Sequence, residues 1–205
     1  MRLIRPALPR RLILATPALL IRPAAAEAPR TPAQMEGPYF PRAIPADADA
    51  DLMRVAGQPR EARGQPLLFE GVVRGRDGAA LPGITVQIWQ ADAEGIYLHP
   101  SDPRLAQRDA GFQGYGRTVT DAAGRYAFRT IRPGLYPGRT PHIHLRATSA
   151  DGRLNLTTQA YFPDSPQNAN DFLLARLPAE SRALLMTRLT AMDSGQRATL
   201  DIVLG

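Results

Sequence analysis

Short runs of alternating hydrophobic and polar residues dominate the chain from residue 67 to residue 205. The runs are rich in Val, Ile, Thr and aromatic residues, and turns such as GRDGAALPG, TDAAG and SADG separate them. This pattern is typical of β-strands joined by tight turns, and its spacing predicts an all-β protein with a single β-sandwich domain. The predicted strands cover residues 67–75, 84–90, 124–131, 142–148, 155–162 and 198–205.

Two stretches depart from the strand pattern. The segment PAESRALLMTRLTAM, residues 178–192, places Leu185, Leu189 and Met192 at helical spacing after a proline, which predicts one short helix near the C-terminus. Residues 27–65 are rich in Pro, Ala and Asp, and their apolar residues show neither the alternation of a strand nor the spacing of a helix. We therefore expect an extended N-terminal arm over residues 27–65, followed by the sandwich over residues 66–205.

The first 26 residues have the organisation of an export signal. Twin arginines at Arg10 and Arg11 precede a mostly apolar run of 10 residues from Leu12 to Ile21, and small residues offer a cleavage site after Ala26 or Ala28. This run is too short to cross a bilayer, which needs about 20 apolar residues. We expect a twin-arginine-type signal over residues 1–26, a periplasmic or extracellular protein and no membrane span. The alternative is a disordered Arg- and Pro-rich N-terminus.

The charge distribution argues against a nucleic-acid partner. The formal net charge is +6, but five arginines lie in the first 26 residues, so the remainder carries only +1. Every basic residue is an arginine, and those after residue 26 are scattered instead of clustered with aromatic residues. The chain has no cysteine, so any metal must be bound by His, carboxylate or Tyr oxygen.

Two of the three histidines form a His-x-His pair in the predicted strand 142–148. Residues i and i+2 of a strand point to the same face, so His142 and His144 project together while Ile143 and Leu145 face the opposite way. Two imidazoles on one face can converge on a metal ion. The same pattern also suits two structural histidines that are satisfied by hydrogen bonds.

Tyrosines are the candidates for further metal ligands. Tyr97 follows the predicted strand 84–90, and Tyr136 lies in the loop before the histidine pair. Taken singly, each is better explained as a core or loop aromatic residue whose hydroxyl finds a hydrogen bond. We expect His99 to be a solvated loop residue and no ligand. Tyr39 and Tyr115 are interpreted as lining a substrate entrance or packing within surface loops.

Five segments occur in a definite order within residues 36–164: EGPYFP, GVVRGRDGAALPGITVQIWQADAEGIY, GYGRTVTDAAGRYAFRTIRPGLYP, PHIH and LTTQAYFPD. Together they resemble the intradiol ring-cleavage dioxygenases, a family that includes catechol and protocatechuate dioxygenases. The resemblance implies a catalytic sandwich and one mononuclear non-haem Fe(III). The implied metal ligands are Tyr97, Tyr136, His142 and His144. Arg139, Gln159 and Tyr136 are the implied catalytic residues.

The implied reaction opens a catecholic ring between its two hydroxylated carbons, with both atoms of O2 incorporated, to give a muconate-type diacid. Tyr136 would act as the base, Arg139 would stabilise negative charge on the substrate, and Gln159 would donate to a substrate oxygen. Two phenolates favour Fe(III), whereas a triad of two histidines and one carboxylate suits Fe(II). By the same resemblance, a homo-oligomer would assemble through the N-terminal arm.

The loop between Tyr136 and His142 departs from the family pattern, because relatives carry a longer insertion there. The shorter loop predicts a more open mouth that accepts larger catechols. Two other classes of function remain open from the sequence. One is a non-catalytic, transthyretin-like binding module, which would bind no iron. The other is a His-based zinc hydrolase, which would be colourless and would activate water.

Overall fold

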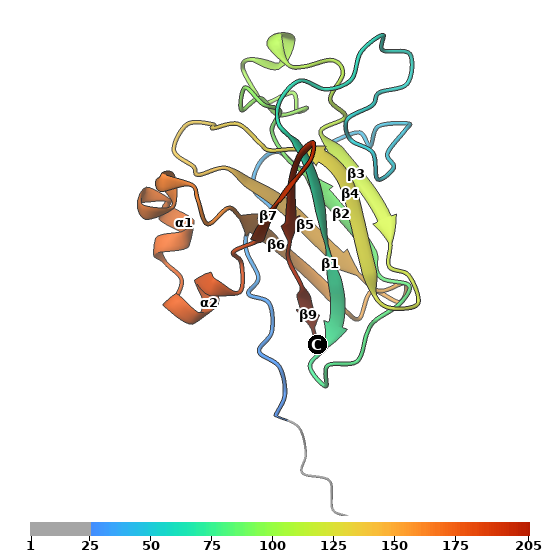
Figure 1. Cartoon of the computed structure of the whole chain (residues 1–205), viewed down its shortest axis with the longest axis vertical. Helices are drawn as coiled ribbons and strands as arrows, with labels where there is room; N and C mark the ends of the chain where they lie inside the picture. The colour runs from blue at the N-terminus through green and yellow to red at the C-terminus, as the bar shows by residue number, and fades with distance from the viewer. Residues whose placement is uncertain (1–25) are drawn as a thin grey trace, which may run out of the picture.

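Two β-sheets packed face to face form the body of the protein (Figure 1). The computed structural model describes residues 26–205, so the export signal expected over residues 1–26 lies outside it except for Ala26. The first sheet has the strand order β4-β1-β8-β7, with β9 also paired to β1, and the second has the order β3-β2-β5-β6. The predicted all-β sandwich is confirmed. The first sheet comprises β1 (Pro66–Gly75), β4 (Arg125–Ile131), β7 (Arg188–Met192), β8 (Gly195–Thr199) and β9 (Ile202–Leu204), and the second β2 (Thr85–Trp89), β3 (Tyr115–Val119), β5 (His142–Thr148) and β6 (Asn155–Tyr161).

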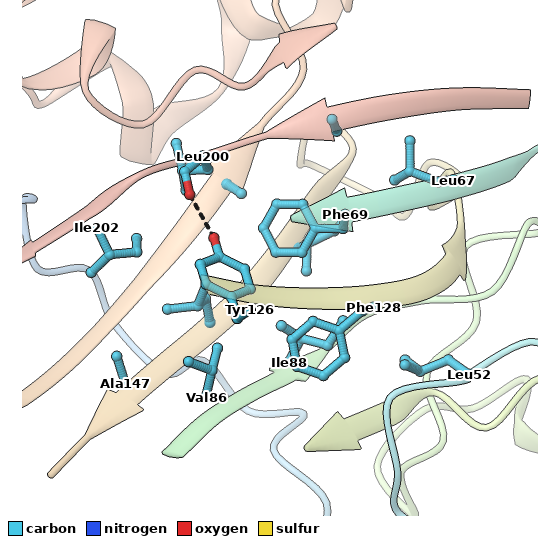
Figure 2. Packing of buried hydrophobic residues seen from close by; sticks show 14 of the residues in the cluster. Leu52, Leu67, Phe69, Val86, Ile88, Tyr126, Phe128, Ala147, Leu200 and Ile202 are labelled. Atoms are coloured by element: carbon cyan, nitrogen blue, oxygen red, sulfur yellow. Dashed lines mark hydrogen bonds between the residues drawn. The ribbon is translucent and has the colours of Figure 1, made fainter. Parts of the chain in front are cut away.

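The core lies between the two sheets and is built by alternation along the strands (Figure 2). In β1 the side chains of Leu67, Phe69 and Val73 are buried, whereas those of Leu68 and Val72 are partly exposed. One polar group enters this core: the Tyr126 hydroxyl donates a hydrogen bond of 2.6 Å to the carbonyl oxygen of Leu200. A buried phenol is therefore satisfied without water.

Helical structure within residues 26–205 is confined to α1 (Phe172–Ala175), α2 (Ala179–Ala183) and the 3-10 turns η1 (Leu105–Gln107) and η2 (Pro166–Asn170). The helix predicted over residues 178–192 is wrong beyond residue 183. There the chain continues into β7, which pairs antiparallel with β8 around Asp193 and Ser194. Leu185 is buried beside α1, but Met192 lies exposed on an edge strand. Pairing with β8 outweighs the helical spacing of these apolar residues.

Two further strand predictions need correction. The run 198–205 is divided into β8 and β9, because the Asp201 side chain takes the place of a ladder acceptor and receives the backbone N–H of Val72 at 3.1 Å. Residues 115–119 form β3, which the sequence pattern did not predict. Tyr115 therefore does not lie in a loop at an entrance; it is fully buried in β3, opposite Trp89 of β2.

The N-terminal arm ties the two sheets together. Thr31 exchanges hydrogen bonds with Val203 of β9, through its N–H at 3.1 Å and its hydroxyl at 2.9 Å. Three residues later, the N–H of Gln34 donates to the carbonyl of Thr157 in β6 at 2.9 Å. Residues 26–65 contain no helix and no extended strand, and Figure 1 shows their first part in blue beside the sandwich. The arm is thus held by backbone contacts to both sheets.

The described residues include no helix with the length and apolar character needed to cross a membrane.

Candidate functional site

Strand β5 carries the histidine pair on the face that points away from the core. Ile143 and Leu145 are fully buried in the core cluster, and His142 and His144 project to the other side, as the strand period predicted. Their Nε2 atoms lie 3.2 Å apart, and the hydroxyl oxygen of Tyr97 lies 3.4 Å from Nε2 of His142. Two nitrogen atoms from β5 and one oxygen atom from the loop after β2 therefore lie close together.

The two tyrosines are brought to this point by neighbouring loops. The backbone N–H of Tyr97 donates to the Asp102 carboxylate at 2.9 Å, which fixes the first loop. Gly95 in the same loop has a φ of 74°, and a Cβ there would lie 1.8 Å from the carbonyl oxygen of Leu135, so only glycine allows the two loops to touch. The rings of Tyr97 and Tyr136 lie 5.6 Å apart, nearly perpendicular. The Tyr136 ring is 6.0 Å from that of His142.

Burial sets the protonation states of these groups. It lowers the pKa of His142 to about 3, an effect that the charge of Arg139 reinforces, and it holds the pKa of His144 well below its ordinary value. Burial likewise raises the pKa of the Tyr97 hydroxyl above its ordinary value, and the nearby Tyr136 adds to the effect. Both imidazoles are therefore neutral at neutral pH, and the Tyr97 phenol keeps its proton unless a cation stabilises the phenolate.

The carbonyl oxygen of Thr140 determines the tautomer of His142. Its Nδ1 lies 2.6 Å from the carbonyl oxygen of Thr140, which can only accept, so Nδ1 carries the proton. The lone pair on Nε2 is then free and directed toward His144 and Tyr97. This arrangement, with one ring nitrogen bound to a backbone carbonyl and the other open, is characteristic of metal-ligating histidines. Nδ1 of His144 is buried and has no hydrogen-bond partner among residues 26–205.

Arg139 and Gln159 lie side by side, as expected for residues that share a site. Nη2 of Arg139 donates to Oε1 of Gln159 at 2.7 Å and to the hydroxyl of Tyr161 at 3.1 Å, while Nε donates to the Asp171 carboxylate at 2.8 Å. The amide nitrogen of Gln159 donates to the carbonyl of Met35 in the arm at 3.1 Å. The amide oxygen of Gln159 is thus used to hold Arg139.

Two of these contacts were missed in the sequence. Neither Tyr161 nor Asp171 was among the predicted site residues. An Asp before the apolar run FLLA is an N-cap signal, and its side chain does accept from the N–H groups of Leu173 and Leu174 in α1. Nothing in that signal shows that the same carboxylate contacts Arg139, 32 residues earlier.

The arm forms a roof over the tyrosines and histidines. The Tyr39 ring stacks on Tyr97 with a centroid distance of 4.5 Å and meets Tyr136 edge-on at 5.7 Å. Tyr39 therefore covers the cluster directly. Trp89 stacks on His144 with a centroid distance of 4.8 Å and so forms part of the site wall. His99 was expected to be solvated, but this is wrong: it is buried under the roof.

A cavity of about 520 Å³ opens beside the cluster and borders on Tyr136 and Arg139. Its volume is typical of a small-molecule site. Leu135 and Pro137 contribute apolar surface, and Asp171 forms part of the wall. A larger hollow of about 660 Å³ lies over β1 and β4, but none of the clustered residues line it. The smaller cavity is therefore the candidate entrance.

Comparison with known proteins identifies the family to which this chain belongs. A family model described as Dioxygenase matches residues 35–205. The chain is 37% identical over 149 residues to the protocatechuate 3,4-dioxygenase beta chain of Burkholderia cepacia, a match covering 69% of this chain and 63% of that one. It is 31% identical over 163 residues to catechol 1,2-dioxygenase 1 of Acinetobacter lwoffii, covering 71% and 50%. The chain belongs to the intradiol ring-cleavage dioxygenase family. The matches span only about half to two thirds of these relatives' lengths.

Solved structures of the family share the fold. The dioxygenase domain of a dioxygenase carbohydrate-binding protein fusion from Streptomyces sp. SirexAA-E is 38% identical, with a TM-score of 0.67, and the match covers 85% of this chain and 97% of that domain. Catechol 1,2-dioxygenase from Acinetobacter sp. ADP1 is 26% identical, with a TM-score of 0.65 and coverage of 85% and 62%. The chain therefore matches a solved dioxygenase domain over nearly the full length of that domain.

Proposed function

We propose that this protein is an Fe(III)-dependent intradiol dioxygenase that opens a catecholic ring between its two hydroxylated carbons, using O2, to form a muconate-type diacid. The observation that carries the proposal is the convergence of two neutral histidines and Tyr97 at 3.2 to 3.4 Å, with Tyr136 beside them. Family membership supports the same chemistry.

The residues fit a ferric ion better than zinc. No group of three His, Cys, Asp or Glu side chains within residues 26–205 is placed to hold a metal, so tyrosines must complete any site built on His142 and His144. Phenolate oxygens are hard anionic donors suited to Fe(III). A trivalent ion also supplies the positive charge needed to deprotonate Tyr97 in its buried position. We therefore assign Tyr97, Tyr136, His142 and His144 as the iron ligands.

The two tyrosines have different surroundings and therefore different roles. Tyr97 is 2% exposed and packed beneath Tyr39, whereas Tyr136 is half-buried and borders the cavity. Only Tyr136 has space to move aside as a catechol enters, and it would then take up a proton from a substrate hydroxyl. Tyr97 stays in place. A ferric ion held by these residues would supply the Lewis acidity that activates the carbons of a bound catecholate toward O2.

Arg139 supplies the fixed positive charge on the substrate side of the site. Its side chain is held at three acceptors in a largely buried position, where a cation stabilises developing negative charge more strongly than in water. The open cavity of about 520 Å³ supports the entry of substituted catechols as well as catechol itself.

The visible absorption spectrum and iron content of the purified protein test the proposal. We expect a tyrosinate-to-iron charge-transfer band that shifts when a catechol is added anaerobically. If the protein stays colourless after reconstitution with ferric iron, the tyrosines are structural and the proposal fails. A colourless zinc-containing protein would favour a hydrolase, and a protein that binds neither metal would favour a binding module.

Export through the twin-arginine route is proposed from residues 1–26, whose Arg10-Arg11 pair precedes the apolar run. Replacing both arginines by lysine should leave the protein in the cytoplasm, because this route reads the arginine pair and charge alone is insufficient. Fractionation of the producing cells gives the answer. Unchanged export of the Lys-Lys variant would refute this route. Assembly into a homo-oligomer through the arm stays a prediction, and O2 enters the proposal as the co-substrate.

A further inference from the structure

One carboxylate outside the ligand set lies between the substrate side and the metal side of the site. The Asp171 side chain has no exposed surface. Its Oδ2 accepts from Nε of Arg139 at 2.8 Å and from the backbone N–H of Thr140 at 3.0 Å. Its Oδ1 accepts from the N–H groups of Leu173 and Leu174 at 3.0 and 3.1 Å. A carboxylate accommodates about four such bonds, so the hydrogen-bonding capacity of Asp171 is filled.

The contact with Arg139 determines which way the guanidinium faces. Asp171 binds Nε, and Gln159 and Tyr161 both bind Nη2. Nη1 is then the only guanidinium nitrogen without a hydrogen bond to a residue within 26–205, and Arg139 lines the cavity. Nη1 is thus left for the substrate. Without Asp171, the two bonds to Nη2 alone would allow the planar group to swing about its long stem.

Through Thr140, Asp171 also influences the orientation of His142. The N–H of Thr140 is held by Oδ2 of Asp171, and the carbonyl oxygen of Thr140 accepts the Nδ1 proton of His142 at 2.6 Å. The Thr140 hydroxyl also donates to Asn168 in η2 at 2.7 Å. Oδ2 of Asp171 therefore positions both Thr140, which orients the His142 ring, and Arg139, which borders the cavity.

We propose that Asp171 is a positioning residue for ring cleavage, which holds Arg139 toward the substrate and, through Thr140, holds the His142 ring toward the metal. This inference rests on the proposed function. The competing explanation is that Asp171 only caps the four-residue helix α1. The two explanations differ in what they require: asparagine and serine cap helices about as well as aspartate, but neither supplies the negative charge that a buried arginine needs.

The test compares iron-loaded, full-length Asp171→Asn with wild type and with Asp164→Asn. Asp164 forms a bidentate pair with Arg132 at 2.7 and 2.9 Å near the protein surface, so it is a matched Arg–Asp control outside the site. We expect Asp171→Asn to lower kcat by roughly 10- to 100-fold, the usual effect of removing a partner that orients a ligand. KM should change less, because the charge of Arg139 acts mainly as the ring gains negative charge. Asp164→Asn should have wild-type kcat.

Folding and function are separated by two additional measurements. Thermal unfolding should show that Asp171→Asn still folds cooperatively, at a lower Tm than wild type because the buried Arg139 loses its charged partner. Asp171→Ser, which also caps the helix, provides a second variant with the same expected loss of kcat. In the iron-free protein, the Arg139 Nε–H resonance should be protected from exchange in wild type and lose that protection in Asp171→Asn.

Wild-type kcat and a protected Nε–H in a folded Asp171→Asn would reduce Asp171 to a helix cap and overturn the inference. Failure of both the Asn and the Ser variants to fold would do the same, because it would show a purely structural role. An inactive, colourless wild type would refute the proposed function by itself. The exchange measurement in the iron-free protein would then still decide whether Asp171 positions Arg139.

Discussion

Replacing Tyr97 by phenylalanine is expected to remove most of the visible absorption of the iron-loaded protein and to abolish ring cleavage. The change deletes one oxygen that lies 3.4 Å from Nε2 of His142 and leaves the ring stacked under Tyr39. With the proposed ligand set, Fe(III) would lose one of its two anionic donors. We expect iron affinity to fall by at least about 100-fold, the upper end of the loss seen when only an outer partner of a ligand is removed.

Iron content and the absorption spectrum of Tyr97→Phe measure this directly. Tyr126→Phe is the matched control, because it also removes a buried, hydrogen-bonded phenol oxygen but lies in the core on a strand of the other sheet (Figure 2). The control should keep its colour and lose only about 1 kcal/mol of stability with its hydrogen bond. A Tyr97→Phe protein that retains most of its bound metal without colour would instead support the zinc hydrolase.

Arg139→Lys is expected to lower kcat by about 100- to 1,000-fold, the range found when a single preorganised donor to developing negative charge is lost. Lysine keeps the positive charge near Asp171 and so avoids leaving a buried carboxylate unpaired. It cannot, however, contact Asp171, Gln159 and the substrate together, because its ammonium is a single point without the planar fork of arginine.

Steady-state kinetics with a catechol under air give kcat and KM for this variant. Arg132→Lys serves as the control, since Arg132 also makes a bidentate ion pair, with Asp164, but does not border the cavity. We expect wild-type kcat for the control and an unchanged resting spectrum for both variants. If Arg139→Lys turned over catechol at the wild-type rate, a fixed cation would not be needed and its assigned role would be wrong.

Strand alternation predicted most of the sandwich, and the errors have a common physical cause. The segment from Arg188 to Met192 contains apolar residues at helical spacing, yet it becomes an edge strand because the turn at Asp193 and Ser194 folds it onto β8. Strand β3 was hidden by Gly116, which weakens the local strand signal. Glycine is required there because a Cβ would lie only 2.8 Å from the carbonyl oxygen of Asp49 in the arm. In each case a partner distant from the local pattern determined the structure.

The candidate site was predictable only where its geometry is local. The His142 and His144 pair follows from the period of one strand, and the tyrosines, Arg139 and Gln159 were identified through family resemblance. Asp171 could not be found in this way, because its role depends on a contact between η2–α1 and a loop 32 residues earlier. Tyr39 was expected to line an entrance or to pack within surface loops, whereas it stacks on Tyr97, since no sequence pattern states where an irregular arm will lie.

The arm has a consequence for the order in which the protein assembles. Its anchors join residues far apart in the chain: Thr31 and Val203 are separated by 172 positions, and Gln34 and Tyr161 by 127. Contacts of such long range form late, because the entropy of closing the loop must be overcome first. On the ribosome, Thr31 cannot be anchored until Val203 has emerged. The Thr31 anchor of the arm that carries Tyr39 can therefore form only after β9 has been synthesised, later than the contacts of Gln34 with β6.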